Sequence, residues 1–443
     1  MKDLTKGNPL ILILQFSIPI CLGNIFQLFY SLADTRIVGK YLGESALAAV
    51  GSTNSLNSMI IGFLLGMTNG FAIIVARYFG AKKFEQMRKA IGVTFTIGVS
   101  IAVVFTVISV AFLSNILELL NTPHSIMNQA SDYFTIILLG MTASMLYNIC
   151  SGILRAVGDA VTPLFFLIGS TVCNVVLDLL CVKDFHMGVK GAAYATVISQ
   201  ILAFVLCMIY MWVKYPVLRI GRKDMMAEKT LVKEMVATGF SMGFMLSLIN
   251  IGSVALQTCI NRFGKDIIVA HTAARRITDV FMMPFTVFGA TMATYCGQNL
   301  GAGKYDRIRK GLKITIGITW IWCLLVVIIS YTIVPVFVKM VTGTDNAEVI
   351  NTATLYLKVN TILYFVCTIV CIMRNALQGI GDTKTPVISS SIELITKVAV
   401  AITLAPYMGY WAIIIAEPVS WVLMVVPILV QMWRNPILNV RKV

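Results

Sequence analysis

The sequence GAKKFEQMRK at residues 80–89 returns in the second half of the chain as GAGKYDRIRK at residues 301–310. A second stretch, LRAVGDAVTP at residues 154–163, returns as LQGIGDTKTP at residues 377–386, two residues out of that register. Because the separation of the copies is half of the 443 residues, we interpret the chain as two equivalent halves. Helix-ending glycines, Gly-Asp turns and Thr-Pro helix starts make up these motifs, so they indicate the fold and say little about chemistry.

The composition is that of a chain embedded in lipid. Apolar residues make up 58%, charged residues only 12%, and the mean hydropathy is +0.85, whereas a soluble domain carries about 25% charged residues. Apolar runs long enough to cross about 30 Å of hydrocarbon lie near 9–33, 46–78, 92–117, 127–153, 163–183, 189–213, 235–261, 268–299, 312–339, 350–376, 386–406 and 408–433. The sequence predicts an all-α integral membrane fold: twelve transmembrane helices in two pseudo-symmetric six-helix bundles.

The most polar long connection lies between the sixth and seventh spans, at residues 214–233. We therefore predict an N-lobe over residues 1–218, a cytoplasmic linker over 219–232 and a C-lobe over 233–443. Six spans per half is an even number, so the lobes should be related by an axis along the membrane normal. Such a pair favours a ligand site in a cleft between the bundles, although a gene duplication without mechanistic meaning would leave the same repeat.

The net charge of +15 is compatible with nucleic-acid binding, but its distribution argues against that function. Counted from a cytoplasmic N-terminus, the inner loops hold most of the Lys and Arg residues and the outer loops hold few, which is the positive-inside bias. We expect a multi-pass protein of the plasma (inner) membrane with both termini in the cytoplasm. We expect the protein to interact with the lipid bilayer and not with nucleic acid. The first span is expected to act as its targeting signal.

Polar side chains inside the first five spans point to a site. An ionised group at mid-bilayer costs about 2.5–3.5 kcal/mol on insertion scales, so it needs a partner or a task. Asp34 lies late in the first span, after Asn24 and Gln27. Asn174 and Asp178 share one face of the fifth span and have no basic residue at helical spacing. A carboxyl group in low dielectric can exchange a proton near neutral pH, and with neighbouring oxygens it can hold a hard cation such as sodium.

The acids of the second half have more ordinary explanations. Glu393 is followed one turn later by Lys397, and the two can simply neutralise each other, as can Arg275 and Asp279. Glu417, beside Pro418 in the last span, has no such neighbour.

Two residues of the first span leave alternatives open. Asp34 is either part of a site or close enough to the outer surface to be merely solvated. Pro19 breaks the ladder of helical hydrogen bonds, which gives either a hinge or a static bend.

Nothing in the sequence indicates catalysis. Only three histidines are present, at residues 124, 186 and 271, and they are far apart. The ten cysteines lie mostly within apolar runs without a CxxC motif, which is typical of buried thiols that act as small hydrophobic side chains. We expect no catalytic residue, no metal site and no enzyme activity.

The order of the motifs adds a resemblance to a known family. Pro19 precedes DT at residues 34–35, VG at 38–39, LG at 42–43 and LAAVG at 47–51; GA follows at 80–81 and 301–302, and GDTKTP at 381–386. This order is similar to that of the MATE (multidrug and toxic compound extrusion) transporters over essentially the whole chain. The resemblance implies two six-helix lobes around a V-shaped cavity, and export of cationic or amphipathic compounds in exchange for protons or sodium.

The resemblance also implies roles for residues of the N-lobe. Asp34 matches the first-helix aspartate of bacterial members, in which it forms part of the cation or proton site. Asn174 and Asp178 match the fifth-helix pair of that site, and Thr196 matches its sixth-helix threonine. In the first helix, Gln27 matches a polar cavity position and Pro19 the point where the helix bends.

The C-lobe fits the family less well. Members with a C-lobe coupling site carry acids in the seventh and tenth helices, where this chain offers Ser247, Asn250 and Asn360. A coupling site of that type is therefore in doubt. Glu393 and Glu417 are candidates for the substrate cavity, together with Asn24 and Gln27 of the first span.

These observations together predict a secondary active antiporter that works by alternating access. We expect a monomer without a cofactor, coupled to protons or sodium ions and exporting small hydrophobic or cationic drugs. The alternative is a lipid-linked oligosaccharide flippase of a related two-lobe plan. A flippase needs a strongly cationic cavity to hold pyrophosphate, whereas the interior charges here are mixed.

Overall fold

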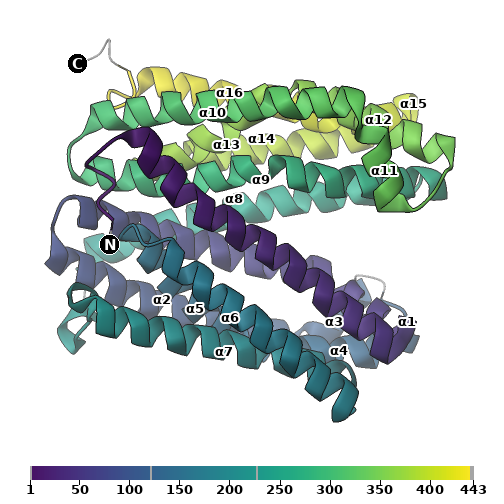
Figure 1. Cartoon of the computed structure of the whole chain (residues 1–443), viewed down its shortest axis with the longest axis horizontal. Coiled ribbons are helices and arrows are strands. Elements are labelled where there is room, and N and C mark those ends of the chain that lie inside the picture. The colour runs from purple at the N-terminus through teal and green to yellow at the C-terminus, as the bar shows by residue number, and fades with distance from the viewer. Residues whose placement is uncertain (1, 120–121, 226–227, 440–443) are drawn as a thin grey trace. The chain divides into compact units, whose positions relative to one another are not determined.

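The computed structural model describes residues 2–119, 122–225 and 228–439, and these are almost entirely helical, without a β-strand (Figure 1). The elements are α1 (Pro9–Gly80), α2 (Phe84–Ala111), α3 (Leu113–Leu119), α4 (His124–Leu139), α5 (Met141–Ala156), α6 (Val161–Asp178), η1 (Leu179–Asp184), α7 (Gly188–Lys214), η2 (Pro216–Leu218), η3 (Arg222–Met225), α8 (Lys229–Ile260), α9 (Lys265–Gly301), α10 (Tyr305–Thr332), α11 (Val334–Thr342), α12 (Ala347–Ile362), α13 (Tyr364–Gly379), α14 (Thr385–Ala399), η4 (Val400–Leu404), α15 (Ala405–Met408) and α16 (Tyr410–Arg434).

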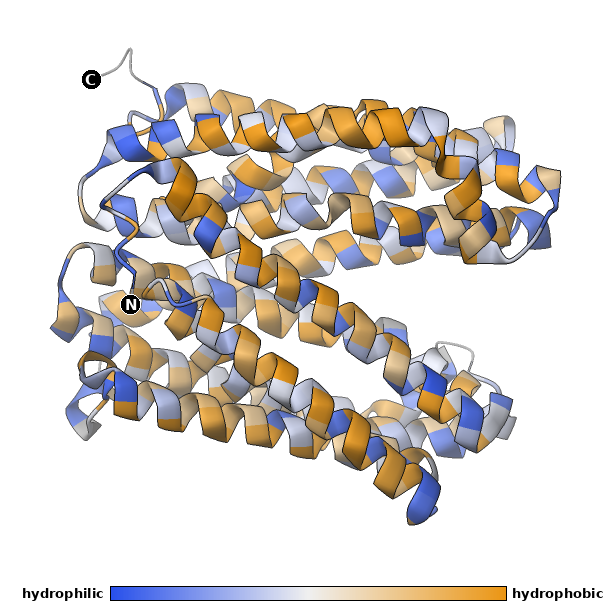
Figure 2. Ribbon diagram, in the orientation of Figure 1, coloured by the Kyte–Doolittle hydropathy of each residue, from blue (hydrophilic) through white to orange (hydrophobic). Residues whose placement is uncertain are grey.

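The described helices supply ten to twelve candidate membrane spans. Ten helical segments are each long and apolar enough to cross a membrane, and two of them, Pro9–Asn54 and Leu56–Gly80, belong to α1, whose backbone is non-helical at Gly43. Two bent pairs complete the set: α4 with α5, bent by 43°, and α12 with α13, bent by 58°. Apolar residues occupy most of the length of the helices, and polar residues gather near their ends (Figure 2). The predicted fold class is confirmed.

The sequence repeat is also present in the helices. α2 and α10 have the same length, 28 residues, and each begins a few residues after its copy of the GA motif. The four helices of the two bent pairs are each 16 residues long. The two π-helices, η1 and η4, follow directly after α6 and α14. These helices therefore correspond in pairs between the two halves.

The helices pack into two compact units. Unit 1 comprises Met1–Asp3 and Gln15–Gly243, and unit 2 comprises Leu4–Leu14 and Phe244–Val443. Two helices are thus shared, because α1 begins in unit 2 and α8 begins in unit 1. The lobes predicted over residues 1–218 and 233–443 stay a prediction.

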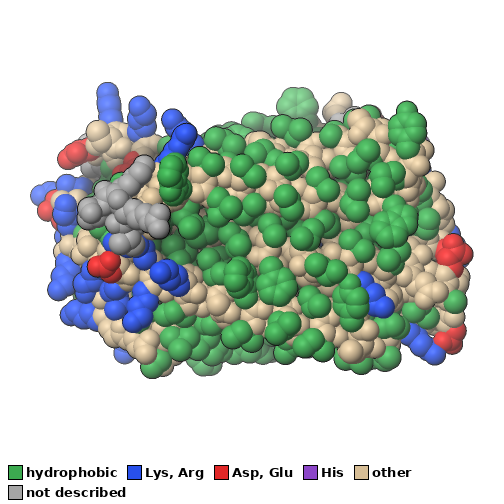
Figure 3. All heavy atoms as spheres, turned by 90° about the horizontal axis from the view of Figure 1, so that it is seen from above, with side chains coloured by type: hydrophobic (Ala, Val, Ile, Leu, Met, Phe, Trp, Pro, Cys, Tyr) green, Lys and Arg blue, Asp and Glu red, His purple; other side chains and the backbone are tan. Residues whose placement is uncertain are grey.

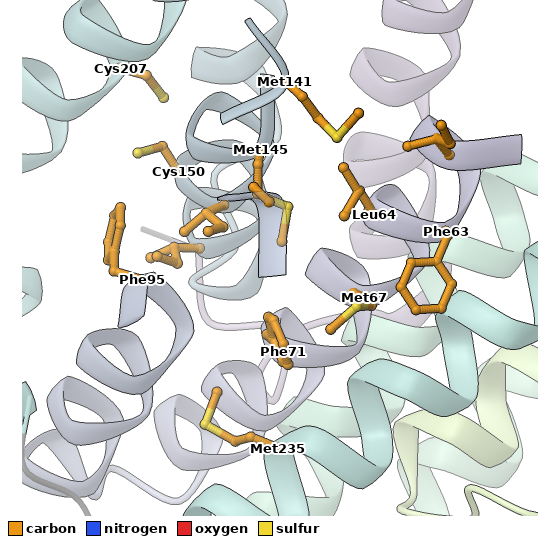
Figure 4. Close-up of a cluster of buried hydrophobic side chains, with 14 of the residues drawn as sticks. Phe63, Leu64, Met67, Phe71, Phe95, Met141, Met145, Cys150, Cys207 and Met235 are labelled. Carbon is orange, nitrogen blue, oxygen red and sulfur yellow. The ribbon is translucent and has the colours of Figure 1, made fainter. Parts of the chain in front are cut away.

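The core of unit 1 is built from sulfur-containing and aromatic side chains. Figure 4 shows Phe63, Met67 and Phe71 of α1 in the same cluster as Met145 of α5 and Met235 of α8. Between helices in a membrane, lipid tails are as apolar as the side chains, so close van der Waals packing provides the attraction. Flexible methionines fill such irregular spaces well.

Small residues let α1 and α8 approach each other within unit 1. Gly66 and Gly70 of α1 form a GxxxG pair, as do Gly239 and Gly243 of α8. A Cβ atom on Gly66 would lie 2.5 Å from the carbonyl oxygen of Met242, so the two backbones are in direct contact. Such small-residue contacts are a common interface between transmembrane helices.

The surface agrees with a lipid environment. On the face seen in Figure 3, hydrophobic side chains cover the middle and Lys and Arg side chains gather at one end. This distribution is expected of a protein whose apolar band lies in hydrocarbon and whose basic end lies near phosphate headgroups.

Candidate functional site

Four polar side chains from three helices come together in unit 1. Asp34 belongs to α1, Asn174 and Asp178 lie one turn apart on α6, and Thr196 belongs to α7. Asn174 and Asp178 are fully buried. The π-helix η1 begins directly after Asp178, and π-turns within α-helices are frequent at functional sites. The structure thus brings together the four residues expected to form the coupling site, and their role in coupling stays a prediction.

Asn174 organises this cluster. With its amide nitrogen turned towards Asp178, it donates a hydrogen bond to Asp178 Oδ2 at 3.0 Å and accepts one from the backbone N–H of Thr196 at 3.2 Å. The hydroxyl groups of Thr196 and Tyr30 lie 3.2 Å apart, and either can donate to the other. The cluster is therefore held by hydrogen bonds between side chains of all three helices.

The carboxyl groups of Asp34 and Asp178 are hydrogen-bonded to each other. Because an ionised carboxylate can only accept hydrogen bonds, this bond requires a proton on one of the two groups. Within the described residues neither carboxyl group forms a salt bridge, and Oδ1 of each is buried without a donor. Two neighbouring acids without a basic partner can exchange a proton or bind a small cation.

Tyr30 and Tyr133 belong to this cluster and were not expected from the sequence. Tyr133 of α4 is close enough to Asp34 and Asp178 for their charges to act on its hydroxyl group. Aromatic residues in an apolar span usually pack against neighbours, so nothing in the sequence distinguishes Tyr133. Tyr30 lies one helical turn before Asp34, and that spacing is a signal that places it on the same face of the helix.

A cavity of about 280 Å³ in unit 1 adjoins the cluster. Most of the residues that line it carry polar but uncharged groups, and these residues are Gln27, Tyr30, Ser144, Tyr147, Asn148, Ser170, Thr171, Ser199 and Gln200. Tyr30 lines the cavity and also contacts Thr196, so the cluster and the cavity share a wall. Gln27 lies in this wall, whereas Asn24 is not among the lining residues, and a role of either in substrate binding stays a prediction. The volume is just below the range of about 300–1,000 Å³ usual for ligand pockets.

The acids expected in the substrate cavity, Glu393 and Glu417, lie in a buried ion-pair cluster of unit 2. Lys397 Nζ is 2.8 Å from Glu393 Oε1 and 3.6 Å from Glu417 Oε1. Arg275 Nη1 lies 2.7 Å from Glu417 Oε1, and the hydroxyl group of Tyr356 donates to Glu417 Oε2 at 3.0 Å. The expected neutralisation of Glu393 by Lys397 is therefore present, and a role of either acid in substrate binding stays a prediction.

Three further expectations concern single residues. The pairing of Arg275 with Asp279 is present, with their closest atoms 3.9 Å apart. Mere solvation of Asp34 does not fit its buried Oδ1 and its hydrogen bond to Asp178. α1 continues through Pro19 with helical backbone angles, so the hinge at Pro19 stays a prediction.

Comparisons with known proteins agree with this architecture. The family model MatE matches residues 19–180 and 241–403. The probable multidrug resistance protein YpnP of Bacillus subtilis (strain 168) is 30% identical over 308 residues, which are 69% of this chain and 68% of YpnP. YoeA, another probable multidrug resistance protein of that strain, is 28% identical over 333 residues, 73% of this chain and 72% of YoeA.

A solved structure shows the same fold. It is described as the outward-facing conformation of a multidrug resistance MATE family transporter of the MOP superfamily. It superposes with a TM-score of 0.90 at 22% identity, and the match covers 98% of this chain and 97% of that chain.

Proposed function

Because the chain belongs to the MatE family of multidrug efflux transporters, we propose that it is a secondary active antiporter that exports a drug in exchange for a proton or a sodium ion. This proposal rests on the hydrogen-bonded pair of Asp34 and Asp178, which lies beside a cavity in the same unit. The pair can hold one exchangeable ion, and Tyr30 connects it to the cavity wall.

The proposed cycle follows from the position of Asp34 on α1. In the outward-facing state, Asp34 and Asp178 take up the ion, oriented by Asn174 and Thr196. Ion binding favours a rearranged α1 and release of the drug, and the inward-facing state then discharges the ion and admits new substrate. The ion can drive this cycle only if it binds the two states with different affinity.

The proposed substrates are small hydrophobic or cationic drugs. The cavity offers amide and hydroxyl groups for hydrogen bonds and the rings of Tyr30 and Tyr147. Aromatic faces attract organic cations by about 0.5–2 kcal/mol, depending on how far the cation is desolvated. We propose that the transporter works as a monomer in the plasma membrane with both termini in the cytoplasm. The flippase alternative is not favoured by the family match or by the named relatives.

The test is extrusion of a cationic dye from everted vesicles in which the proton gradient and the sodium gradient are collapsed separately. Collapse of the coupling gradient should stop extrusion, and collapse of the other should leave it. Asp34→Asn and Asp178→Asn should each reduce extrusion at least about tenfold, since each removes an ionisable group that the cycle requires.

The matched control is Asp132→Asn. Asp132 is a half-exposed acid of α4 in the same unit, paired with Lys190 at 3.2 Å, and its loss should leave extrusion unchanged. Wild-type extrusion in both Asp34→Asn and Asp178→Asn would exclude the proposed coupling site.

A further inference from the structure

We propose that unit 2 carries the repeat counterpart of the Asp34–Asp178 cluster, with the cation position filled by the amino group of Lys397, so that removing this group opens a binding site for a small monovalent cation. The register of the repeat, the contacts of Lys397 and the packing around its side chain each support this assignment.

The register places the two clusters at equivalent positions of equivalent helices. Alignment of the starts of α4 and α12, at His124 and Ala347, relates Tyr133 to Tyr356. Alignment of the Thr-Pro sequences at 162–163 and 385–386, near the starts of α6 and α14, relates Asn174 to Lys397 and Ser170 to Glu393. The pairs Asn174–Lys397 and Ser170–Glu393 thus follow from the amino-acid sequence alone.

The last pair of helices follows the register of the GA motifs, which pairs position 80 with position 301. In that register Gly188 matches Gly409, and these two glycines, at the starts of α7 and α16, both have positive φ angles, of 63° and 58°. The same register relates Thr196 to Glu417.

Counterpart residues also lie near each other in both units. In unit 1 the amide oxygen of Asn174 lies 3.2 Å from the backbone nitrogen of Thr196. In unit 2 their counterparts Lys397 and Glu417 approach to 3.6 Å. Tyr133 lies within electrostatic reach of the acids of unit 1, and its counterpart Tyr356 donates to Glu417 at 3.0 Å. Asn174 and Thr196 are thus neighbours in unit 1, as their counterparts Lys397 and Glu417 are in unit 2.

The charges, however, are distributed differently. Asp34 corresponds to Ala255, and Asp178 corresponds to an alanine in either register, Ala399 or Ala401. The uncharged Ser170, Asn174 and Thr196 correspond instead to an acid, a base and a second acid. Unit 1 thus has carboxyl groups without a basic partner among the described residues, whereas unit 2 has carboxylates with a lysine between them.

Lys397 is suited to act as a built-in cation. Its side chain is only 3% exposed, and its ammonium group lies 2.8 Å from Glu393 Oε1, a distance at which a free cation would also be held. A lysine ammonium is a compact point charge on a flexible stem. The lysine stem passes α8 at Gly252, where a Cβ atom would lie 3.2 Å from Lys397 Cδ. The glycine, which has no side chain, therefore leaves room for the stem.

Loss of the amino group would leave an acceptor without its partner. The other cation near Glu393 is Arg374, whose Nη1 lies 3.8 Å from Glu393 Oε2 and donates instead to Ser390 at 3.1 Å. Arg275 is paired with Glu417, and Arg276 and Asp279 are exposed. A buried carboxylate without a close partner is unfavourable, so the vacated volume should take up a cation from solution.

The experiment measures thermal unfolding of the purified full-length protein in sodium chloride, ethylammonium chloride and choline chloride at matched ionic strength. In Lys397→Ala, sodium or ethylammonium should raise the melting temperature by about 2 °C or more relative to choline, with saturation. Lys397→Met is the matched control, because it also removes the charge but fills the space, and it should show no such difference. Lys397→Ala with Glu393→Gln should lose the response.

Two results would overturn the proposal: an equal response to the three salts in Lys397→Ala, or the same salt preference in Lys397→Met. If Lys397→Ala is recovered folded only when ethylammonium is present during extraction, the proposal is supported; if none of the three salts yields folded protein, it is rejected. A second measurement keeps the native lysine. Asp34→Asn combined with Asp178→Asn removes both acids of unit 1 and should show no saturable sodium response, and a residual response would count against an already filled site in unit 2.

If the site of unit 2 is filled, ion exchange is confined to unit 1, and this consequence rests on the proposed function. The melting experiment does not measure transport. The assignment of Lys397 can therefore fail while the dye assay supports antiport, and antiport can fail in the dye assay while the melting experiment supports the assignment of Lys397.

Discussion

At the scale of single residues, the spans hold two kinds of buried carboxyl group. Asp34 and Asp178 have no salt-bridge partner among the described residues and are hydrogen-bonded to each other. Glu393 and Glu417 are held by Lys397 and Arg275. A carboxyl group without a fixed counter-charge can change its protonation or bind an ion, whereas a paired carboxylate is held ionised. This difference supports the proposal that Asp34 and Asp178 exchange the ion, whereas Glu393 and Glu417 stay in ion pairs.

Tyr30→Phe tests the connection between cluster and cavity. The variant keeps the ring in the cavity wall and removes only the hydroxyl group that lies 3.2 Å from Thr196 Oγ1. A hydrogen bond contributes about 0.5–1.5 kcal/mol, so we expect the ion gradient needed for half-maximal dye extrusion to increase by up to about tenfold. Tyr41→Phe, on an exposed side chain of the same helix, should have no effect. Equal results for the two variants would show that the Tyr30 hydroxyl group takes no part in coupling.

Glu417→Gln tests the fixed cluster of unit 2. The substitution keeps the size of the side chain but removes the charge that faces Arg275 at 2.7 Å and Lys397 at 3.6 Å. Removing one partner of a buried ion pair costs about 3–5 kcal/mol, so the melting temperature of the purified protein should fall by many degrees. Glu85→Gln, at a pair with Lys89 on an exposed helix face, should melt as the native protein does. A melting temperature unchanged in Glu417→Gln would mean that these ion pairs do not stabilise unit 2.

The residues of the site could be predicted from the sequence, whereas contacts between side chains of different helices could not. Asp34, Asn174, Asp178 and Thr196 were expected together, and they meet in unit 1. Lys397 was expected beside Glu393 because four residues along a helix share a face. Its approach to Glu417 was not expected, because that contact joins two helices whose packing has no signature in the spacing of residues.

At the scale of helices, the Gly-Asp motifs show what the repeated sequence does. Asp159 Oδ1 accepts from the backbone N–H of Thr162 at 3.0 Å, and Asp159 Oδ2 accepts from its hydroxyl group at 2.7 Å. Asp382 accepts the same two bonds from Thr385, at 3.0 and 2.6 Å. These bonds satisfy donors at the starts of α6 and α14, so the structural interpretation of this motif is confirmed.

Asp159 also holds the chain beyond the end of α7. The hydroxyl group of Tyr215, which lies outside the membrane spans, donates to Asp159 Oδ2 at 2.7 Å. Burial, and then the hydrogen bond to Asp159, raise the pKa of Tyr215 above its ordinary value. Tyr215 therefore remains a neutral donor at physiological pH, and its contribution to stability would decline only as the pH rises past the ordinary range of tyrosine.

The bends of two spans could not be predicted from hydropathy. The apolar runs near 127–153 and 350–376 are continuous in the sequence, yet each forms two helices, with breaks at Gly140 and Leu363. A hydropathy window records the length of an apolar run and not the direction of its axis. At the break at Gly140 the helices are closely packed, because a Cβ atom there would lie only 2.2 Å from Val197 Cγ2.

Gly70→Ala tests the contact between α1 and α8. A Cβ atom on Gly70 would lie 2.7 Å from the carbonyl oxygen of Thr238, and backbone cannot move aside as a flexible side chain can. We expect a fall in melting temperature and in the yield of extracted protein, because overpacking of this kind costs about 1–3 kcal/mol. Gly51→Ala is the matched control, since Gly51 lies on the same helix with nothing within 4 Å of an added Cβ atom. Equal stability of the two variants would argue against this contact.

At the scale of the whole molecule, the chain does not divide into its two units at one point. Residues 4–14 pack within unit 2, although the rest of α1 packs within unit 1. Side chains of the second GAGKYDRIRK motif hold this N-terminal segment: Lys304 Nζ donates to the carbonyl oxygen of Thr5 at 2.7 Å, and Arg307 donates to those of Leu4 and Gly7 at 3.2 and 2.9 Å. In exchange, the first part of α8, up to Gly243, packs within unit 1.

This exchange of segments predicts how the molecule responds to division within the linker. Residues 1–218 expressed alone would lack the part of α8 that completes unit 1, and residues 219–443 alone would lack the segment that completes unit 2. Neither half should be recovered as a folded, monodisperse protein, because each would expose packed surface. The second half would also lack the carbonyl partners of Lys304 and Arg307. Co-expression supplies both segments and should restore extractable protein and dye extrusion.

Arg307→Ala in the second half should weaken this restoration. Arg309→Ala, whose partner Asp306 is nearly fully exposed, should not weaken it. Recovery of either half alone, with the melting temperature of the intact protein, would show that the exchanged segments are dispensable and that the two units fold independently.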